Sequence, residues 1–196
     1  MDDLSTGVHA KITVHNLTLD ILYSAKTAEY DTDTGRYREI QRIKIYNSAG
    51  KLVQVLKNPG MIVGEEKFLD TIDVNFDGYA DLEIFSHDGG AGPNCGNNYY
   101  IFNPHTGLFN FNQQLSALSQ PSISSKTKSI YSSCRAGAGI HGQETYAWRD
   151  RTLTLVEFYE TNYLDDDNVS VTHQFLVDGE MKGESMIIKA SELESK

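Results

Sequence analysis

The residues best suited to chemistry are the oxygen-bearing side chains of segment 73–81, Asp-Val-Asn-Phe-Asp-Gly-Tyr-Ala-Asp. A calcium loop needs hard oxygen donors at alternate residues, and a glycine where the backbone turns sharply. Gly78 is that glycine. The spacing predicts a Ca²⁺ site with the ligands Asp73, Asn75, Asp77, the carbonyl oxygen of Tyr79, and Asp81. A turn rich in Asp, Asn and Gly that binds no metal is the alternative.

The residues after this loop predict a strand. A helix-loop-helix calcium hand carries a glutamate at position 12, which is Ile84 here. Leu82, Ile84 and Phe85 alternate around Glu83, as in a half-buried strand. The loop therefore resembles the calcium loops of integrin-like β-propeller blades, in which the metal stabilises the fold.

Two glycine-rich segments are candidate partner-binding loops. Segment 132–146 contains three glycines that allow close approach of a partner, and its polar side chains can hydrogen-bond an enzyme's carboxyl groups. Its candidate contact residues are Gly139, His141, Gly142, Glu144 and Tyr146. Segment 86–95 adds His87 and Asp88. An ordinary connection between strands is the alternative for both segments.

The sequence favours a binding protein over an enzyme. It contains neither a G-x-S-x-G nucleophile elbow nor a phosphate-binding G-x-x-x-x-G-K-[ST] loop. The six histidines form no H-E-x-x-H zinc motif. We therefore expect no catalytic residues.

Charge restricts the partners. The chain has 17 Lys and Arg residues and 27 Asp and Glu residues, which gives a formal net charge of −10. Its basic residues do not cluster with aromatic residues. This argues against nucleic acid and favours a basic protein partner, although acidity also simply aids solubility. No segment offers the ~20 apolar residues that span a bilayer. Residues 1–7 lack the basic and apolar regions of a signal peptide, and one interpretation is a mature segment in which a start Met replaces a signal peptide or lipoprotein leader.

Cys95 and Cys134 are the two cysteines. An even count fits one disulfide, which would stabilise the fold by roughly 4 kcal/mol in the chain-entropy model. We expect this bond, consistent with a compartment outside the cytoplasm, where calcium is abundant. Two reduced thiols are the alternative.

Strand periodicity extends along the chain. Hairpins are predicted over 40–57, with a turn at 47–50, and over 99–111, with Pro104 and Gly107 in the connection. Further hairpins surround 149–151 and 178–179, and only 115–119 and 190–195 suit a helical turn. We predict one all-β domain over 1–196, a sandwich or β-propeller-like, with loose termini at 1–7 and 190–196. Its aromatic residues are expected in the core more than on a sugar-binding platform.

The chain resembles a family of bacterial envelope proteins across about residues 65–160. The matching motifs are 68–82, which contains the calcium loop, the glycines at 89–92, and 99–107, Tyr-Tyr-Ile-Phe-Asn-Pro-His-Thr-Gly. The family includes periplasmic immunity lipoproteins that protect cells against lysozyme-like effectors of the antibacterial type IV secretion system.

The resemblance implies a calcium-stiffened, β-propeller-like inhibitor of a peptidoglycan hydrolase, located in the periplasm or at the outer membrane. It implies that a loop enters the cleft of the enzyme, where two carboxyl groups act on the glycan. The alternative function is a calcium-stabilised module that binds glycan or another surface ligand without inhibiting an enzyme.

Overall fold

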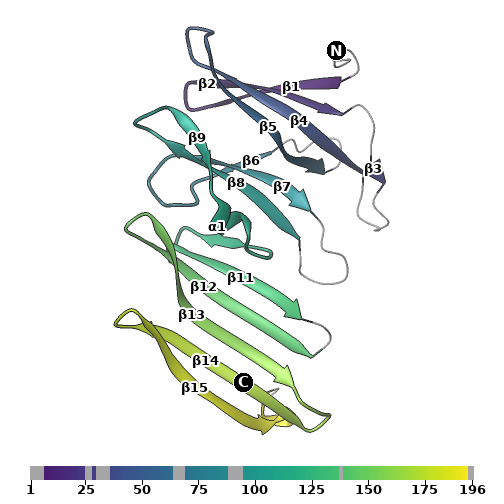
Figure 1. The fold of residues 1–196 in the computed structure, drawn as a ribbon, viewed down its shortest axis with the longest axis vertical. Coiled ribbons are helices and arrows are strands. Elements are labelled where there is room, and N and C mark those ends of the chain that lie inside the picture. The colour runs from purple at the N-terminus through teal and green to yellow at the C-terminus, as the bar shows by residue number, and fades with distance from the viewer. Residues whose placement is uncertain are drawn as a thin grey trace. The chain divides into compact units, whose positions relative to one another are not determined.

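The protein is all-β, as the sequence predicts, and is built of antiparallel sheets (Figure 1). The structure, a computed structural model, describes residues 7–24, 28–29, 36–63, 69–87, 95–136 and 139–193. The chain divides into two compact units, Met1–Asp88 with Gly96–Ala117, and Gly89–Cys95 with Leu118–Lys196. The expectation of one domain over 1–196 stays a prediction.

The first unit holds two sheets. The five-stranded sheet has the order β1-β2-β4-β3, with β5 pairing to β4. Its strands are β1 (Gly7–Val14), β2 (Leu17–Ser24), β3 (Ala28–Glu29), β4 (Arg36–Tyr46) and β5 (Leu52–Val63). The four-stranded sheet runs in chain order through β6 (Asp70–Ile72), β7 (Asp81–His87), β8 (Gly96–Asn103) and β9 (Leu108–Phe111). The predicted hairpins at 40–57 and 99–111 are confirmed as β4–β5 and β8–β9.

One apolar cluster packs these two sheets together. Fully buried Leu19, Ile21 and Ile43 come from the first sheet, and Leu82 and Ile84 come from the second. Alternation in these strands places their apolar side chains on one face, so both sheets bury that face against each other. This core fixes β7, and with it the end of the loop that precedes β7.

Gly60 marks the closest approach between the sheets. A Cβ atom at residue 60 would overlap the carbonyl oxygen of Phe85 and lie 2.6 Å from Cγ2 of Ile84. Its φ of 150° is also uncommon for a residue with a side chain. The Pro59-Gly60 pair therefore lies inside β5 because the backbone of β7 passes there.

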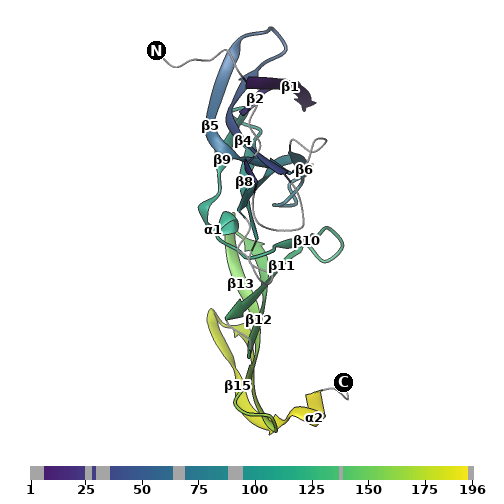
Figure 2. The same cartoon turned by 90° about the vertical axis from the view of Figure 1, so that its right-hand side faces the viewer.

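The second unit is dominated by a six-stranded sheet in which strand order follows chain order. Its strands are β10 (Ser122–Ser124), β11 (Ser129–Ala136), β12 (Ile140–Arg149), β13 (Thr152–Tyr163), β14 (Asn168–Val177) and β15 (Glu180–Lys189). The hairpins predicted around 149–151 and 178–179 are β12–β13 and β14–β15. Figure 2 shows β11–β15 nearly edge-on as one layer. Side chains along β13 and β14 are mostly half-buried.

Two short helices lie where the sequence allows a helical turn. α1 (Gln113–Ser116) begins after Asn112, whose side chain accepts a hydrogen bond from the N–H of Leu115. α2 (Ala190–Leu193) follows β15, within the tail expected to be loose. Gly7 already belongs to β1, while residues 1–6 and 194–196 lie outside the described part. No helix in the described part is long and apolar enough to cross a membrane.

Candidate functional site

The predicted calcium loop connects β6 to β7, and a strand follows it as expected. The loop curves tightly because Phe76 and Gly78 both adopt positive φ, 60° and 89°. Such angles are accessible to glycine without strain, and they are uncommon for phenylalanine. The backbone thus bends twice within three residues, which brings the alternating oxygen-bearing side chains toward the inside of the bend.

Those side chains accept hydrogen bonds from the backbone of the loop. The Asp73 carboxylate accepts from the N–H groups of Asp77 at 3.0 Å and Gly78 at 2.9 Å. Oδ1 of Asn75 also accepts from Asp77 N–H, at 3.2 Å, and Oδ1 of Asp77 accepts from Tyr79 N–H, at 2.9 Å. Asn75 Nδ2 donates to Asp77 Oδ2 at 2.9 Å. Side chains that hydrogen-bond the backbone a few residues ahead pre-form the turn.

Asp81, the last predicted ligand, is fully buried. Its Oδ2 accepts from Val74 N–H at 3.0 Å, and its Oδ1 accepts from Phe102 N–H at 2.8 Å. Burial raises the pKa of Asp81 to about 7, and the negative charges of Asp77 and Asp73 add to the rise, although the two backbone hydrogen bonds lower it. Because the negative charges of Asp77 and Asp73 reach this carboxyl group, a cation in the loop would favour its charged form.

The donor chemistry of the loop fits calcium. Three carboxylates, one amide oxygen and one backbone carbonyl are all hard oxygen donors, and each carboxylate oxygen has a lone pair beyond the one that accepts an N–H group. In this structure, the carboxylates of Asp73, Asp77 and Asp81 accept hydrogen bonds from backbone N–H groups. Within the described residues, no group of three or more His, Cys, Asp or Glu side chains is gathered closely enough to hold a metal ion. The ligand assignment therefore stays a prediction.

Sequence reasoning missed His15, which lies against this loop. Nε2 of His15 donates to the carbonyl oxygen of Ala80 at 2.8 Å, across 65 residues of sequence. The imidazole also stacks on Phe102, with ring centroids 4.2 Å apart. No local motif could reveal this contact, because it depends on packing between β1–β2 and β7–β8.

The predicted partner loop 132–146 is mostly strand, which corrects the expectation of a long loop. β11 and β12 pair from Ser129 with Ala147 to Ala136 with Ile140. Gly142 is buried and pairs with Cys134 on one side and Glu160 on the other. Gly142 therefore fills a buried position between two paired strands and does not expose its backbone to a partner.

The candidate side chains of β12 lie on opposite faces of the sheet, since residues of odd and even number alternate along a strand. His141 is near the hairpin end, where its Nδ1 accepts from Nε of Arg135 at 3.2 Å. Glu144 faces the other way, and its carboxylate accepts from the Tyr146 hydroxyl at 2.9 Å. Gly139, at the end of the hairpin, accepts from Tyr163 N–H at 2.9 Å. The structure thus separates His141 from Glu144 and Tyr146.

The second predicted partner segment falls largely outside the described residues. His87 ends β7, and nothing of its side chain is described, while Asp88 lies outside the described part. Cys95 is a free, half-buried cysteine, and the side chain of Cys134 is outside the described part. The structure therefore does not support the predicted disulfide.

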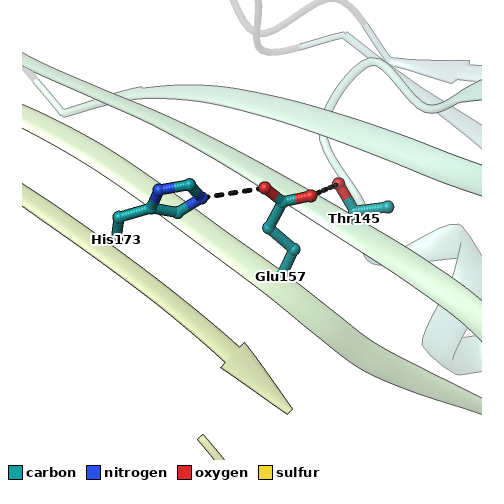
Figure 3. A network of polar contacts seen from close by, with 3 residues as sticks. All are labelled: Thr145, Glu157 and His173. Atoms are coloured by element: carbon teal, nitrogen blue, oxygen red, sulfur yellow. Dashed lines mark hydrogen bonds and ion pairs between the residues drawn. The ribbon is translucent and has the colours of Figure 1, made fainter. Parts of the chain in front are cut away.

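Figure 3 shows a polar network of Thr145, Glu157 and His173. The strand register places this network on the same sheet face as His141. Nε2 of His173 contacts Oε1 of Glu157 at 2.8 Å, and the Thr145 hydroxyl donates to Oε2 of Glu157 at 3.4 Å. Aromatic rings surround the network, with Tyr159 and Phe175 centred 5.4 Å and 4.3 Å from the His173 ring. The sequence signal for it is the run of aromatics in these strands, which we expect mainly in the core.

Comparisons with known proteins show the fold and leave the family open. No protein-family model matches the chain, and no curated protein matches its sequence. A solved structure of a Xanthomonas type IV secretion system related protein is similar, with a TM-score of 0.69 and 19% sequence identity. The match covers 94% of this chain and 96% of that one. The chain thus shares its fold with a protein associated with a type IV secretion system.

Proposed function

We propose that this protein is an extracytoplasmic immunity protein that inhibits a lysozyme-like peptidoglycan hydrolase effector. The observation that carries the proposal is the shared fold with the Xanthomonas type IV secretion system related protein, which extends over nearly the whole length of both chains. The family resemblance of the motifs in 68–107 points in the same direction. The protein acts by binding and performs no catalysis itself.

The charge of the chain supports a cationic partner. A formal net charge of −10 attracts a basic hydrolase, and the attraction acts mainly on the association rate. Lysozyme-type enzymes act through two carboxyl groups in a groove that binds the glycan. An inhibitor therefore needs both a charged surface that steers the encounter and a protruding group that occupies the groove.

The described residues at the end of the β11–β12 hairpin are the best candidates for contact with the groove. Arg135 and His141 lie side by side there, and each carries N–H donors that suit a carboxyl group. Tyr163 adds an exposed ring 6.3 Å from the His141 ring. Because β12 is paired to β11 and β13 along its length, the hairpin keeps its shape before binding, which lowers the entropy cost of association.

Calcium at the loop 73–81 belongs to the same proposal. The residues that would hold it are Asp73, Asn75, Asp77, Asp81 and the carbonyl of Tyr79. A bound ion supplies positive charge that cross-links the bend, and the chain's own residues position the bend between β6 and β7. Its role is to stiffen the first unit.

An inhibition assay tests the function. The Arg135→Ala and His141→Ala variants should each weaken inhibition of the cognate hydrolase by tenfold or more, as expected when a charge-assisted contact at an interface centre is lost. Glu144→Ala, on the opposite sheet face, is the matched control and should inhibit like the native protein. The proposal fails if the native protein neither binds nor inhibits any peptidoglycan hydrolase, its cognate effector included.

Glycan binding is a second candidate function, favoured by the aromatic face around Glu157. Tyr131, Phe175 and Tyr163 on this face are all exposed. Aromatic rings flanking a carboxylate and a hydroxyl can stack on sugar rings and bind their hydroxyl groups. A peptidoglycan pull-down with native protein and Phe175→Ala separates the two functions. Retention lost in the variant favours glycan binding, whereas no retention of either protein favours inhibition.

A further inference from the structure

The side chain of His15, in the β1–β2 turn, contacts Tyr79 and Ala80 of the loop 73–81. We propose that His15 is a positioning residue for calcium, because its side chain restrains the Ala80 peptide group in the second half of the loop. This inference rests on the calcium binding proposed above. It adds a residue that the ligand spacing of the loop does not contain.

The hydrogen bond of His15 falls between two predicted ligands. Nε2 donates to the Ala80 carbonyl at 2.8 Å, since a carbonyl oxygen can only accept. Ala80 stands directly between Tyr79, whose carbonyl is a predicted ligand, and Asp81. Fixing one peptide group therefore restricts the direction of the groups on either side of it.

The ring packing of His15 leads back to the same ligands. The imidazole stacks on Phe102 at an interplanar angle of 24° and meets the Tyr79 ring edge-on at 5.7 Å. The Phe102 backbone in turn donates to Oδ1 of Asp81 at 2.8 Å. His15 thus contacts one predicted ligand residue directly, and it packs on the residue that holds another.

The backbone of the β1–β2 turn presents His15 in a left-handed conformation. His15 adopts a φ of 54°, a conformation uncommon for residues other than glycine. Asn or Gly would be at least as comfortable in a two-residue hairpin turn. Histidine is among the non-glycine residues that enter this region most readily, so the turn accommodates His15 while its ring contacts the loop.

A preset loop binds its ion at a smaller entropy cost, because fewer dihedral angles have to be ordered. Residues that orient metal ligands without touching the metal typically change affinity by about tenfold when they are lost. Affinity, and not only stability, is therefore the quantity that His15 should control.

The experiment measures Ca²⁺ affinity by calorimetry and by competition with Tb³⁺, whose luminescence is excited through tyrosine. His15→Phe keeps an aromatic ring and removes the donor, and it should bind Ca²⁺ about tenfold more weakly. His15→Gln keeps a donor and should recover part of the loss. The same two substitutions at His105, an exposed residue in the β8–β9 turn, are the controls and should leave affinity unchanged.

The outcomes separate the two proposals. If the native protein binds no Ca²⁺, the calcium site itself is wrong. If the native protein binds Ca²⁺ and His15→Phe binds it equally well, the proposed role of His15 is wrong. A His15→Phe variant that melts at a lower temperature in chelator but keeps the native Ca²⁺ affinity also overturns it. Should His15→Phe fail to fold, NMR of the native protein decides: Ca²⁺ must shift the His15 ring signals while His105 stays unmoved, and unmoved His15 signals refute the proposed role.

Discussion

Asp81→Ala is the most informative perturbation, because Asp81 is both a predicted ligand and a structural acceptor. Its two carboxylate oxygens accept hydrogen bonds from the N–H groups of Val74 and Phe102. Each buried donor that loses its acceptor costs about 1–3 kcal/mol, and relief from burying a carboxylate returns part of this. We expect a net loss of about 2–4 kcal/mol without calcium. For a chain of this size, that lowers the melting temperature by roughly 5–15 °C.

The assay is thermal unfolding with excess Ca²⁺ and with chelator. At free calcium of 100 times the dissociation constant, the native protein should gain about 2.7 kcal/mol, whereas Asp81→Ala should gain nothing. Asp166→Ala, at an exposed acidic residue in the other unit, is the control for a lost negative charge. If Asp81→Ala melts in chelator within a degree of the native protein, the structural reasoning is refuted. If calcium leaves the native melt unchanged, the metal site is refuted.

Three further predictions concern packing, ionisation and association. Gly60→Ala should lower the free energy of unfolding in urea by about 1–3 kcal/mol, because the added Cβ overlaps the Phe85 carbonyl and no side-chain rotation can relieve the overlap. An unchanged urea midpoint would contradict the close approach of β5 to β7. Hydrogen bonds from the side-chain amide of Asn168, and then from backbone N–H groups, lower the pKa of Asp165. The ionised Asp165 therefore stabilises the fold above the pKa that it has in the unfolded chain, and this stabilisation is lost as pH falls through its lower pKa in the folded protein. NMR titration should show the pKa of Asp165 returning toward normal in Asn168→Ala, and an unaltered titration would exclude that cause. Association with the hydrolase should slow as salt rises, and a salt-independent rate would exclude electrostatic steering.

Much of the fold could be predicted because its signals are local. Ile43 and Ile45, which alternate with Arg42 and Lys44 beside the turn at 47–50, are enough to identify the β4–β5 hairpin from the sequence alone. The sharp bend at Gly78 and the strand after it follow in the same way from a few neighbouring residues. Such features depend on the period of the strand and on turn chemistry, which the sequence carries directly.

The errors arise where tertiary packing overrides the local signal. The glycines of 132–146 suggest a loop, but Gly142 lies between paired strands, where a small residue suits the sheet. Contacts such as His15 with Ala80 join segments that are distant in sequence and have no periodicity in common. The aromatic face near Phe175 is expected in the core, because periodicity shows that a face is apolar and cannot show whether another layer covers it.

The chain-order arrangement of β10 to β15 has a consequence for how the second unit is made. Every strand there finds its partner immediately before or after itself, so each pairing step closes only a short length of chain. Topologies with such a low contact order form quickly for a β-rich body. We expect this half to assemble hairpin by hairpin, on a faster timescale than the first unit, where β5 must meet β7 and β1–β2 must meet β8 across long stretches of sequence.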